Sequence, residues 1–424
     1  MIIMMVNRDI FALFILKNFV QIFENFPIEL IHLIFCIYRI LPSNALSSSN
    51  DQSLFRINDE IYCSNGDLIK NLPVNKNILQ FILCGDEIYY IDTNYNLWYF
   101  SYYDTNNNTN IDQHKRDTAI SEIIQTRIKY ISGNSNRSFK RSNAAITING
   151  DLYMWGSNLD GQLALEKATY YSLPVRITQL SNVEMVCCGP DYTAAITQEG
   201  DLYTWGCNHY GQLGRDLDND ERLTNIPSRI GSDYISVSCG SKFTMAIKKN
   251  GDLYACGHGY RGQLGLGNAN IGKPNYPYQD AIVLGLSHTN DRKYLTQVPI
   301  PEPVTSVSCG PNFTMAITKN GNLYSWGAND FGQLGFGYIK PTLFDHIGLG
   351  HHIDTYLPVK ILTDANLVSC GNNYAIIMKT DNSVYKCGSN MKQGLSSSIY
   401  ITPTKLILDQ LPKEKLVYNN WFID

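Results

Sequence analysis

The residues that most suggest chemistry are Gly257-His-Gly-Tyr-Arg-Gly262, which fit the G-x-G-x-x-G pattern of dinucleotide-binding loops. Such a loop binds phosphate where a strand leads into a helix N-terminus within a βαβ unit. The corresponding positions elsewhere in the chain read Gly206-Cys-Asn-His-Tyr-Gly211 and Gly327-Ala-Asn-Asp-Phe-Gly332. These glycines therefore belong to a repeated turn, and we expect no cofactor.

A second group of residues could bind a metal, because carboxylates and imidazoles are common metal ligands. They cluster in one polar loop that also contains glycine: Asp345, His346, His351, His352 and Asp354. A solvated surface loop is the favoured interpretation, and a metal site is the alternative. His209 and His258 lie in repeated turns, and we expect both side chains to face solvent.

Recurrent aromatic residues could form a platform for stacking bases. They are Tyr153, Trp155, Tyr203, Trp205, Tyr324 and Trp326. Their recurrence at matching positions instead predicts packing between neighbouring repeats. No Ser-His-Asp or Cys-His arrangement is indicated, so we predict a protein that is not an enzyme, with no catalytic residues and no metal.

The elements that position these residues are repeats of about fifty residues. Four segments share the pattern Gly-Asp/Asn-Leu-Tyr-x-Trp/Cys-Gly, namely 150–156, 200–206, 251–257 and 321–327, and a looser copy spans 382–388. Most continue into Asn-x-x-Gly-Gln-Leu-Gly, as at 208–214 and 329–335. This period suits propeller blades of four short strands, with the remaining residues forming loop insertions.

Local chemistry predicts the strands of each repeat. Alternating and apolar residues predict strands at 306–309, 313–318 and 323–326. Asn320-Gly321, like Asn149-Gly150 and Asn250-Gly251, predicts a two-residue type I′ hairpin, in which both central residues have φ > 0. Alanines recur in the second strand, where a ring that narrows toward its axis needs small side chains: Ala145, Ala195, Ala246 and Ala316.

These motifs resemble the repeat of the regulator of chromosome condensation family. The resemblance rests on Cys-Gly followed by an aromatic residue, Thr and Ala-Ile, then on the two motifs above, over about residues 131–395. It implies an all-β fold, a seven-bladed β-propeller of four-stranded antiparallel blades.

Five clear copies leave two blades to find. Residues 82–100 retain Cys-Gly, a short strand and an aromatic strand, and predict a sixth blade. For the seventh, 54–63 followed by Asn65-Gly66 resembles the second half of a blade, and 403–421 resembles the first half. Pairing N- and C-terminal strands would close the ring and remove a long exposed sheet edge. The propeller would then span residues 51–424.

Residues 1–50 stand outside the repeats and predict a short α-helical extension, with helices at 10–23 and 28–40. Residues 26–35 resemble the opening of an F-box, a segment that docks onto a ubiquitin-ligase adaptor. The residues we assign to partner binding on this basis are Phe26, Pro27, Leu30, Ile31, Ile34 and Phe35. The later F-box helices are missing. The alternatives are a helical pair that packs on the propeller and a membrane-associated hairpin.

Composition limits the class of partner and the compartment. The net charge is −4, with no basic tail to attract nucleic acid, and no uncharged apolar run reaches the length of a membrane span. Of eleven cysteines, five precede glycine at equivalent repeat positions, which we expect to lie too far apart for disulfides: Cys84, Cys188, Cys239, Cys309 and Cys370. We therefore expect a monomer with reduced cysteines in the cytoplasm or nucleus.

Three functions remain open. The leading one is a protein–protein interaction scaffold, in its most specific form the substrate-recognition subunit of a ubiquitin ligase. The resemblance also implies guanine-nucleotide exchange on a small Ran-like GTPase, or chromatin binding, although this chain lacks the basic elements used for nucleosomes. Three insertions, 101–127, 268–303 and 336–357, are the expected contact surfaces, because loops project at the faces of a propeller.

Overall fold

The computed structural model is a succession of short antiparallel strands. It describes residues 54–57, 60–63, 78–84, 87–92, 94–101, 118–119, 127–134, 141–166, 169–217, 222–267, 290–336, 354–381, 383–388 and 400–405. All of these belong to one compact unit, Pro42–Phe422. The predicted helical extension at 1–50 and the predicted closing strand beyond residue 405 lie outside the described residues.

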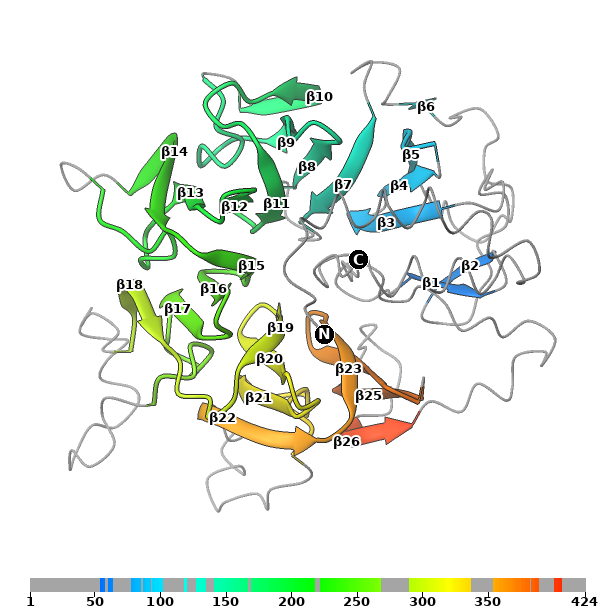
Figure 1. Ribbon diagram of the computed structural model, residues 1–424, viewed down its shortest axis with the longest axis vertical. Helices are drawn as coiled ribbons and strands as arrows, with labels where there is room; N and C mark the ends of the chain where they lie inside the picture. Colours follow the sequence, from blue (N-terminus) through cyan, green and yellow to red (C-terminus); the bar gives the residue numbers. More distant parts are fainter. Residues whose placement is uncertain are drawn as a thin grey trace, which may run out of the picture. The chain divides into compact units, whose positions relative to one another are not determined.

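Within these ranges the strands form six four-stranded sheets, which we call blades 1 to 6 (Figure 1). Blade 1 contains β3 (Ile78–Cys84), β4 (Glu87–Asp92), β5 (Leu97–Ser101) and β6 (Thr118–Ala119). Blade 2 contains β7 (Ile128–Gly133), β8 (Ser142–Thr147), β9 (Leu152–Ser157) and β10 (Tyr170–Arg176). Blade 3 contains β11 (Val183–Cys188), β12 (Tyr192–Thr197), β13 (Leu202–Cys207) and β14 (Leu223–Gly231).

The other three blades repeat this order. Blade 4 contains β15 (Tyr234–Cys239), β16 (Phe243–Lys248), β17 (Leu253–Gly257) and β18 (Arg292–Gln297). Blade 5 contains β19 (Val304–Cys309), β20 (Phe313–Thr318), β21 (Leu323–Gly327) and β22 (Thr355–Leu362). Blade 6 contains β23 (Ala365–Cys370), β24 (Tyr374–Lys379), β25 (Val384–Gly388) and β26 (Tyr400–Lys405). Each strand pairs with the next along the chain, so the predicted strand pattern and the sixth repeat copy are confirmed.

The hairpin between the second and third strands differs from the predicted type I′ turn. In blade 2 the Gly150 N–H donates to the Thr147 carbonyl, and the Thr147 N–H donates to the Asp151 carbonyl, both at 2.9 Å. Gly150 has φ +84°, whereas Asn149 is not among the residues with positive φ. The loop is therefore a type I turn followed by a glycine bulge, which needs only one left-handed residue. This explains why Glu199 can precede Gly200 in blade 3.

The recurrence of the aspartate after this glycine suggests a role in the turn, and the structure shows a second role. Asp151 forms an ion pair with Arg176 at 2.7 Å, and Asp201 forms one with Arg229 at 2.8 Å. In both cases the arginine lies on the fourth strand. The pair therefore ties the hairpin to the outer edge of its own blade, although surface ion pairs of this kind contribute little stability.

In blade 5 the hairpin is fixed by a carboxylate. Glu302 accepts hydrogen bonds from Thr318 (2.9 Å), Asn320 (2.9 Å) and Asn322 (2.8 Å). These hydrogen bonds, that of Thr318 foremost, lower the pKa of Glu302 below its ordinary value because they stabilise the ionised form.

Consecutive blades pack directly on one another. The first strand of each blade contacts the first strand of the next, from β3 and β7 through β19 and β23 (Figure 1). The buried clusters lie between blades: one joins Met185 and Leu202 of blade 3 to Val237 and Ala246 of blade 4. The second-strand alanines are fully buried there, as their small size predicts.

The fourth strands form the outer edges of the blades. Four of them contain a proline, which cannot donate to a further strand and so discourages pairing between molecules. These prolines are Pro174, Pro227, Pro358 and Pro403.

Pro403 also corrects the predicted closure. The sequence places it at the start of the closing half-blade, whereas the structure places it in β26, where Lys405 pairs with Tyr385 of β25. The same pairing joins Lys360 to Tyr324 in blade 5, so residues 400–405 complete blade 6. At the other end of the chain, β1 (Leu54–Ile57) and β2 (Glu60–Cys63) form a two-stranded antiparallel sheet. Ile57 pairs with Glu60 in this sheet, and the predicted hairpin at Asn65-Gly66 lies outside the described residues.

Candidate binding face at the loop end of the blades

The antiparallel order gives every blade two different ends. The connections between first and second strands and between third and fourth strands share one end, which we call the loop end. The connections between second and third strands, the glycine-bulge hairpins, lie at the opposite end, which we call the hairpin end. Neighbouring loop ends face the same way, because Ser241 in the first connection of blade 4 donates to the Pro311 carbonyl of blade 5 at 3.3 Å.

The three insertions predicted as contact surfaces all begin in loop-end connections. Each begins between a third and a fourth strand, namely between β5 and β6 in blade 1, β17 and β18 in blade 4, and β21 and β22 in blade 5, and the predicted ranges 101–127 and 268–303 run on past the fourth strands β6 and β18. The corresponding connection in blade 2, residues 158–169, is much shorter than those of blades 4 and 5 and slightly shorter than that of blade 1. Sequence reasoning found the insertions but could not place them on a common end.

At the loop end, the Asn-x-x-Gly-Gln-Leu-Gly motif forms a self-bonded turn. In blade 3, Asn208 accepts a hydrogen bond from the Leu213 N–H (3.0 Å) and donates one to the Arg215 carbonyl (2.7 Å). The Gln212 side chain accepts from the Tyr210 N–H at 2.9 Å. The motif residues therefore satisfy the polar backbone groups of their own turn, which leaves the variable positions between them to face outward.

The glutamine of the motif also links one blade to the next through its main-chain carbonyl. The Gln263 carbonyl accepts hydrogen bonds from Thr314 (3.0 Å) and from the indole of Trp326 (2.9 Å), both in blade 5. In blade 4 the tryptophan position is Cys256, whose thiol faces the Gln212 carbonyl at 3.6 Å. The tryptophans are thus buried packing residues, as predicted.

Cysteines and serines link the first strands in a similar way. The Cys309 N–H donates to the Ser238 hydroxyl of the preceding blade at 3.1 Å, and Cys370 does the same with Ser308 at 3.0 Å. Burial raises the pKa of the Cys309 thiol to about 12, so it remains protonated and acts as a small packing residue. Cys188, Cys239, Cys309 and Cys370 are therefore structural, as predicted, whereas the Cys84 side chain lies outside the described residues. Reasoning from equivalent positions missed Cys187, which contacts the Cys239 N–H at 3.2 Å.

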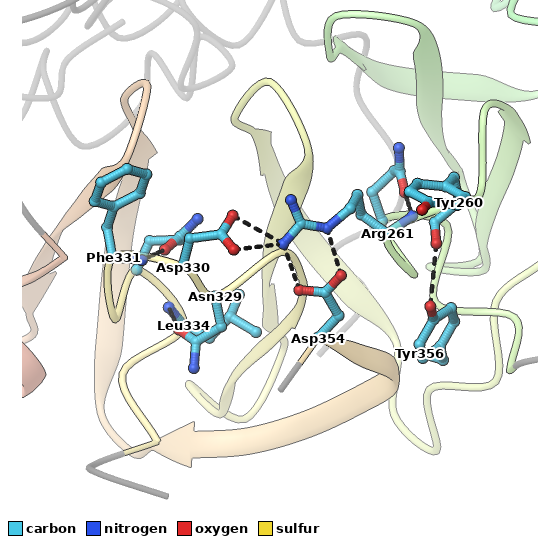
Figure 2. Close-up of polar contacts among 10 residues, drawn as sticks. Tyr260, Arg261, Asn329, Asp330, Phe331, Leu334, Asp354 and Tyr356 are labelled. Atoms are coloured by element: carbon cyan, nitrogen blue, oxygen red, sulfur yellow. Dashed lines mark hydrogen bonds and ion pairs between the residues drawn. The ribbon is translucent and has the colours of Figure 1, made fainter. Parts of the chain in front are cut away.

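The loop ends of blades 4 and 5 are joined by an arginine bound to two aspartates (Figure 2). Arg261 lies in the connection between β17 and β18 of blade 4, between Gly259 and Gly262. Its guanidinium donates to both oxygens of Asp330 (2.9 and 2.8 Å) and to Asp354 (2.7 Å for one contact). Asp354 directly precedes β22, so Arg261 fixes the point where the insertion of blade 5 rejoins the sheet. We call these three residues the Arg261 clasp.

Burial differs within the clasp. The Asp354 side chain is 6% exposed, that of Arg261 18% and that of Asp330 30%. Burial alone would lower the pKa of Arg261, but its contacts with Asp354 and then Asp330 raise it overall. Burial raises the pKa of Asp354, and the opposing effect of Arg261 is smaller. Asp354, the most buried of the three side chains, therefore depends most on its partner.

The Arg261 clasp corrects the prediction for Asp354 and leaves the predictions for Asp345, His346, His351 and His352 untested. The sequence favours a solvated loop for Asp354, with a metal site as the alternative, yet its side chain is buried and binds Arg261. The other four members of that cluster lie outside the described residues. In the part of the chain that the structure describes, no three His, Cys, Asp or Glu side chains converge as metal ligands. The G-x-G-x-x-G segment follows β17 and contributes a turn, which confirms the repeat-turn interpretation.

The histidines of the repeated turns differ from each other. His209 is exposed, as expected. The prediction that His258 faces solvent is wrong, because its ring contacts Tyr210 edge-on at 4.6 Å and stacks against Tyr260 at 6.0 Å. The available signal in the sequence is that His258 differs from the residues at the equivalent positions of neighbouring blades, Cys207 and Ala328. The predicted F-box contacts, Phe26 to Phe35, lie outside the described residues, and no described helix is long and apolar enough to span a membrane.

Comparisons with known proteins agree with this geometry. The family model described as "Regulator of chromosome condensation (RCC1) repeat" matches residues 149–196, 199–247, 250–317 and 320–378, more than half of the chain. The chain is 30% identical over 267 residues to the ultraviolet-B receptor UVR8 of Arabidopsis thaliana, covering 60% of this chain and 53% of the receptor. It is 33% identical over 253 residues to the human X-linked retinitis pigmentosa GTPase regulator, covering 59% and 22%.

Among solved structures, Prp20p from Saccharomyces cerevisiae superposes with a TM-score of 0.63 at 17% identity, covering 86% of this chain and 87% of that one. Prp20p was described together with its binding to Gsp1p and histones. At this identity the likeness shows the fold alone. The matches span about half of UVR8 and about a fifth of the GTPase regulator. The repeats, their strand order and the family model together show that the chain belongs to the RCC1 repeat family.

Proposed function

We propose that this protein is a protein–protein interaction platform that binds its partner through the loop end of the blades. The observation that carries the proposal is that all three insertions begin between a third and a fourth strand. Repeated residues are occupied with turns and blade packing, so the side chains that vary between repeats supply the specificity. Loops positioned by a rigid scaffold commonly carry such function.

The more specific form of this proposal is substrate recognition for a ubiquitin ligase. Support comes from the F-box-like residues Phe26, Pro27 and Leu30 alone, which lie outside the described residues. A pull-down with the ligase adaptor tests this form, with a variant carrying Pro27→Ala and Leu30→Asp as the control. Adaptor retained by the intact chain and lost by the variant supports it, and no adaptor on the intact chain excludes it.

A second candidate partner is a small GTPase, on which the chain would promote nucleotide exchange. It is supported by one relative that is named a GTPase regulator and by a structural relative described as binding Gsp1p. The same description names histones, and a chromatin-binding role is the third candidate. Release of labelled GDP across a panel of Ran-type GTPases tests exchange, and no acceleration by the chain excludes it.

The platform proposal itself is tested by affinity capture followed by mapping of the contact surface. The captured partner is identified by mass spectrometry and then cross-linked to the purified full chain. We expect cross-links at loop-end segments such as 208–214 and 258–265. Cross-links confined to the hairpin end, at segments such as 197–201 and 248–252, would contradict the proposal.

A further inference from the structure

A lysine and three aromatic rings meet where the loop ends of blades 3 and 4 adjoin. The Lys242 ammonium lies 4.4 Å from the centre of the Tyr210 ring and 3.2 Å from its hydroxyl. The His258 ring contacts the edge of Tyr210 on one side and stacks on Tyr260 on the other. We call these four residues the Lys242 patch.

The members of the patch are not needed to build a blade. Lys242 corresponds to Asp191 in blade 3 and to Asn312 in blade 5, and Tyr210 corresponds to Asp160 in blade 2. Only main-chain groups of Lys242 take part in the repeated pattern, where its carbonyl accepts from the His258 N–H at 2.8 Å. The side chains are therefore specific to this place in the fold.

The charges around the patch are unequally compensated. Carboxylates at the loop ends of blades 3 to 5 are engaged: Asp216 accepts from Lys293 and Tyr294, Asp291 accepts from the Gly259 N–H at 2.8 Å, and Asp330 and Asp354 bind Arg261. Lys242 forms no ion pair with a carboxylate among the described residues. Among the described residues its charge is held in place by the ring and hydroxyl of Tyr210, an arrangement that attracts an incoming anion without first having to release one.

We propose that the Lys242 patch binds a carboxylate side chain of a partner protein, carried on an acidic segment with apolar neighbours. The carboxylate accepts from the Lys242 ammonium, and the neighbouring apolar side chain packs on the rings of Tyr210, His258 and Tyr260. A lysine whose ammonium is already held by a tyrosine ring loses little conformational entropy when it binds a partner, and tyrosine itself is enriched among the residues that dominate interface energetics. This inference rests on the proposed function and specifies one contact of its binding face.

The test uses the full chain and a synthetic labelled peptide of twelve residues in which glutamates alternate with leucine and phenylalanine. Binding is measured by fluorescence anisotropy at low ionic strength. Lys242→Gln is expected to weaken binding about tenfold or more, because it removes a charge-assisted contact at the centre of the patch. Tyr210→Phe, which keeps the ring and removes the hydroxyl, is expected to weaken it less.

Two lysines provide matched controls. Lys248 also lies over tyrosine rings, those of Tyr234 and Tyr254 at 5.3 and 5.2 Å, but at the hairpin end. Lys293 lies at the loop end but is paired with Asp216 at 3.3 Å. Lys248→Gln and Lys293→Gln should each leave the affinity within twofold of the original. Equal loss in either control variant, or no loss in Lys242→Gln, would overturn the proposal.

Two further arms define the chemistry of the ligand. The same peptide with glutamine in place of glutamate should bind at least tenfold more weakly, and equal binding would exclude carboxylate recognition. Inorganic phosphate at millimolar concentration should compete poorly, and complete competition would show a general anion site. Failure here is distinguishable from failure of the proposed function. A partner that cross-links to the loop end but binds Lys242→Gln normally would refute this contact and leave the platform proposal intact.

Discussion

The Arg261 clasp provides the sharpest prediction on stability. Arg261→Met removes the cation while keeping much of the apolar length of the side chain. The variant leaves Asp354, which is 6% exposed, without its charged partner, whereas Asp330 at 30% exposed regains water. The cost should therefore come mainly from Asp354.

The magnitude follows from burial. Removing one partner of a fully buried ion pair costs about 3–5 kcal/mol, because the remaining charge is left uncompensated. Arg261 retains some exposure, so we expect about 2–3 kcal/mol for Arg261→Met. Asp330→Asn leaves the Arg261–Asp354 pair in place, and its cost should stay near the surface value of about 0.5–1 kcal/mol.

The assay is urea unfolding of the full chain followed by tryptophan fluorescence, with the free energy taken from the midpoint and slope. The double variant Arg261→Met/Asp354→Leu supplies the decisive comparison. Replacing both charges by apolar groups should recover most of the loss, because no buried carboxylate remains unpaired. Equal destabilisation by Arg261→Met and Asp330→Asn, or no recovery in the double variant, would refute the assignment of the cost to Asp354.

Three further predictions concern packing, pH and backbone. Trp326→Phe should lower stability by about 2 kcal/mol, because it removes a buried indole and its hydrogen bond to the Gln263 carbonyl, and the thermal midpoint measures this. Glu302 has a lowered pKa, so its contribution is present above the ordinary value of about 4.5 and is lost as pH falls through the lowered value. Glu302→Gln should flatten that acid limb of the unfolding curve, and an unchanged limb would contradict the hydrogen-bond assignment. Gly150→Ala should cost about 1–2 kcal/mol by chemical denaturation because φ is positive there, whereas Asn149→Ala should cost under about 0.5 kcal/mol; equal costs would favour a type I′ turn.

The fold was largely predictable because each repeat contains short sequence motifs that specify its strands and turns. Gly-Asp-Leu-Tyr, Cys-Gly and Gly-Gln-Leu mark the same strands and turns in each copy, and even the divergent copy at 82–100 retains enough to be recognised. The hairpin type was not predictable from Asn-Gly alone, because a type I turn with a glycine bulge also ends in glycine. Glu199 before Gly200 was the available signal, since glutamate rarely adopts the left-handed conformation.

The candidate face was less predictable because it depends on contacts between different repeats. Arg261 and Asp354 are 93 residues apart in the chain, and no local pattern joins them. Tyr210, Lys242 and His258 likewise come from two blades. What the sequence did indicate is that these residues depart from the repeat, and the structure shows that departures at the loop end are close enough to act together.

The assignment of the last described strand also depends on contacts between residues far apart in the sequence. The sequence predicts that residues 403–421 form the first half of a closing blade, yet residues 400–405 supply the fourth strand of blade 6. The insertions that separate third from fourth strands make this error natural, since a fourth strand can lie far along the sequence from the strand it pairs with. In blade 4 the two are separated by residues 258–291.

The most direct test of the account is hydrogen–deuterium exchange on the full chain with and without its captured partner. We predict that partner binding slows exchange in the loop-end connections, including 189–191, 208–214, 240–242 and 258–265, and leaves the hairpins at 147–151, 197–201 and 248–252 unchanged. Protection centred on those hairpins, with the loop-end segments unaffected, would contradict the claim that partners bind at the loop end of the blades.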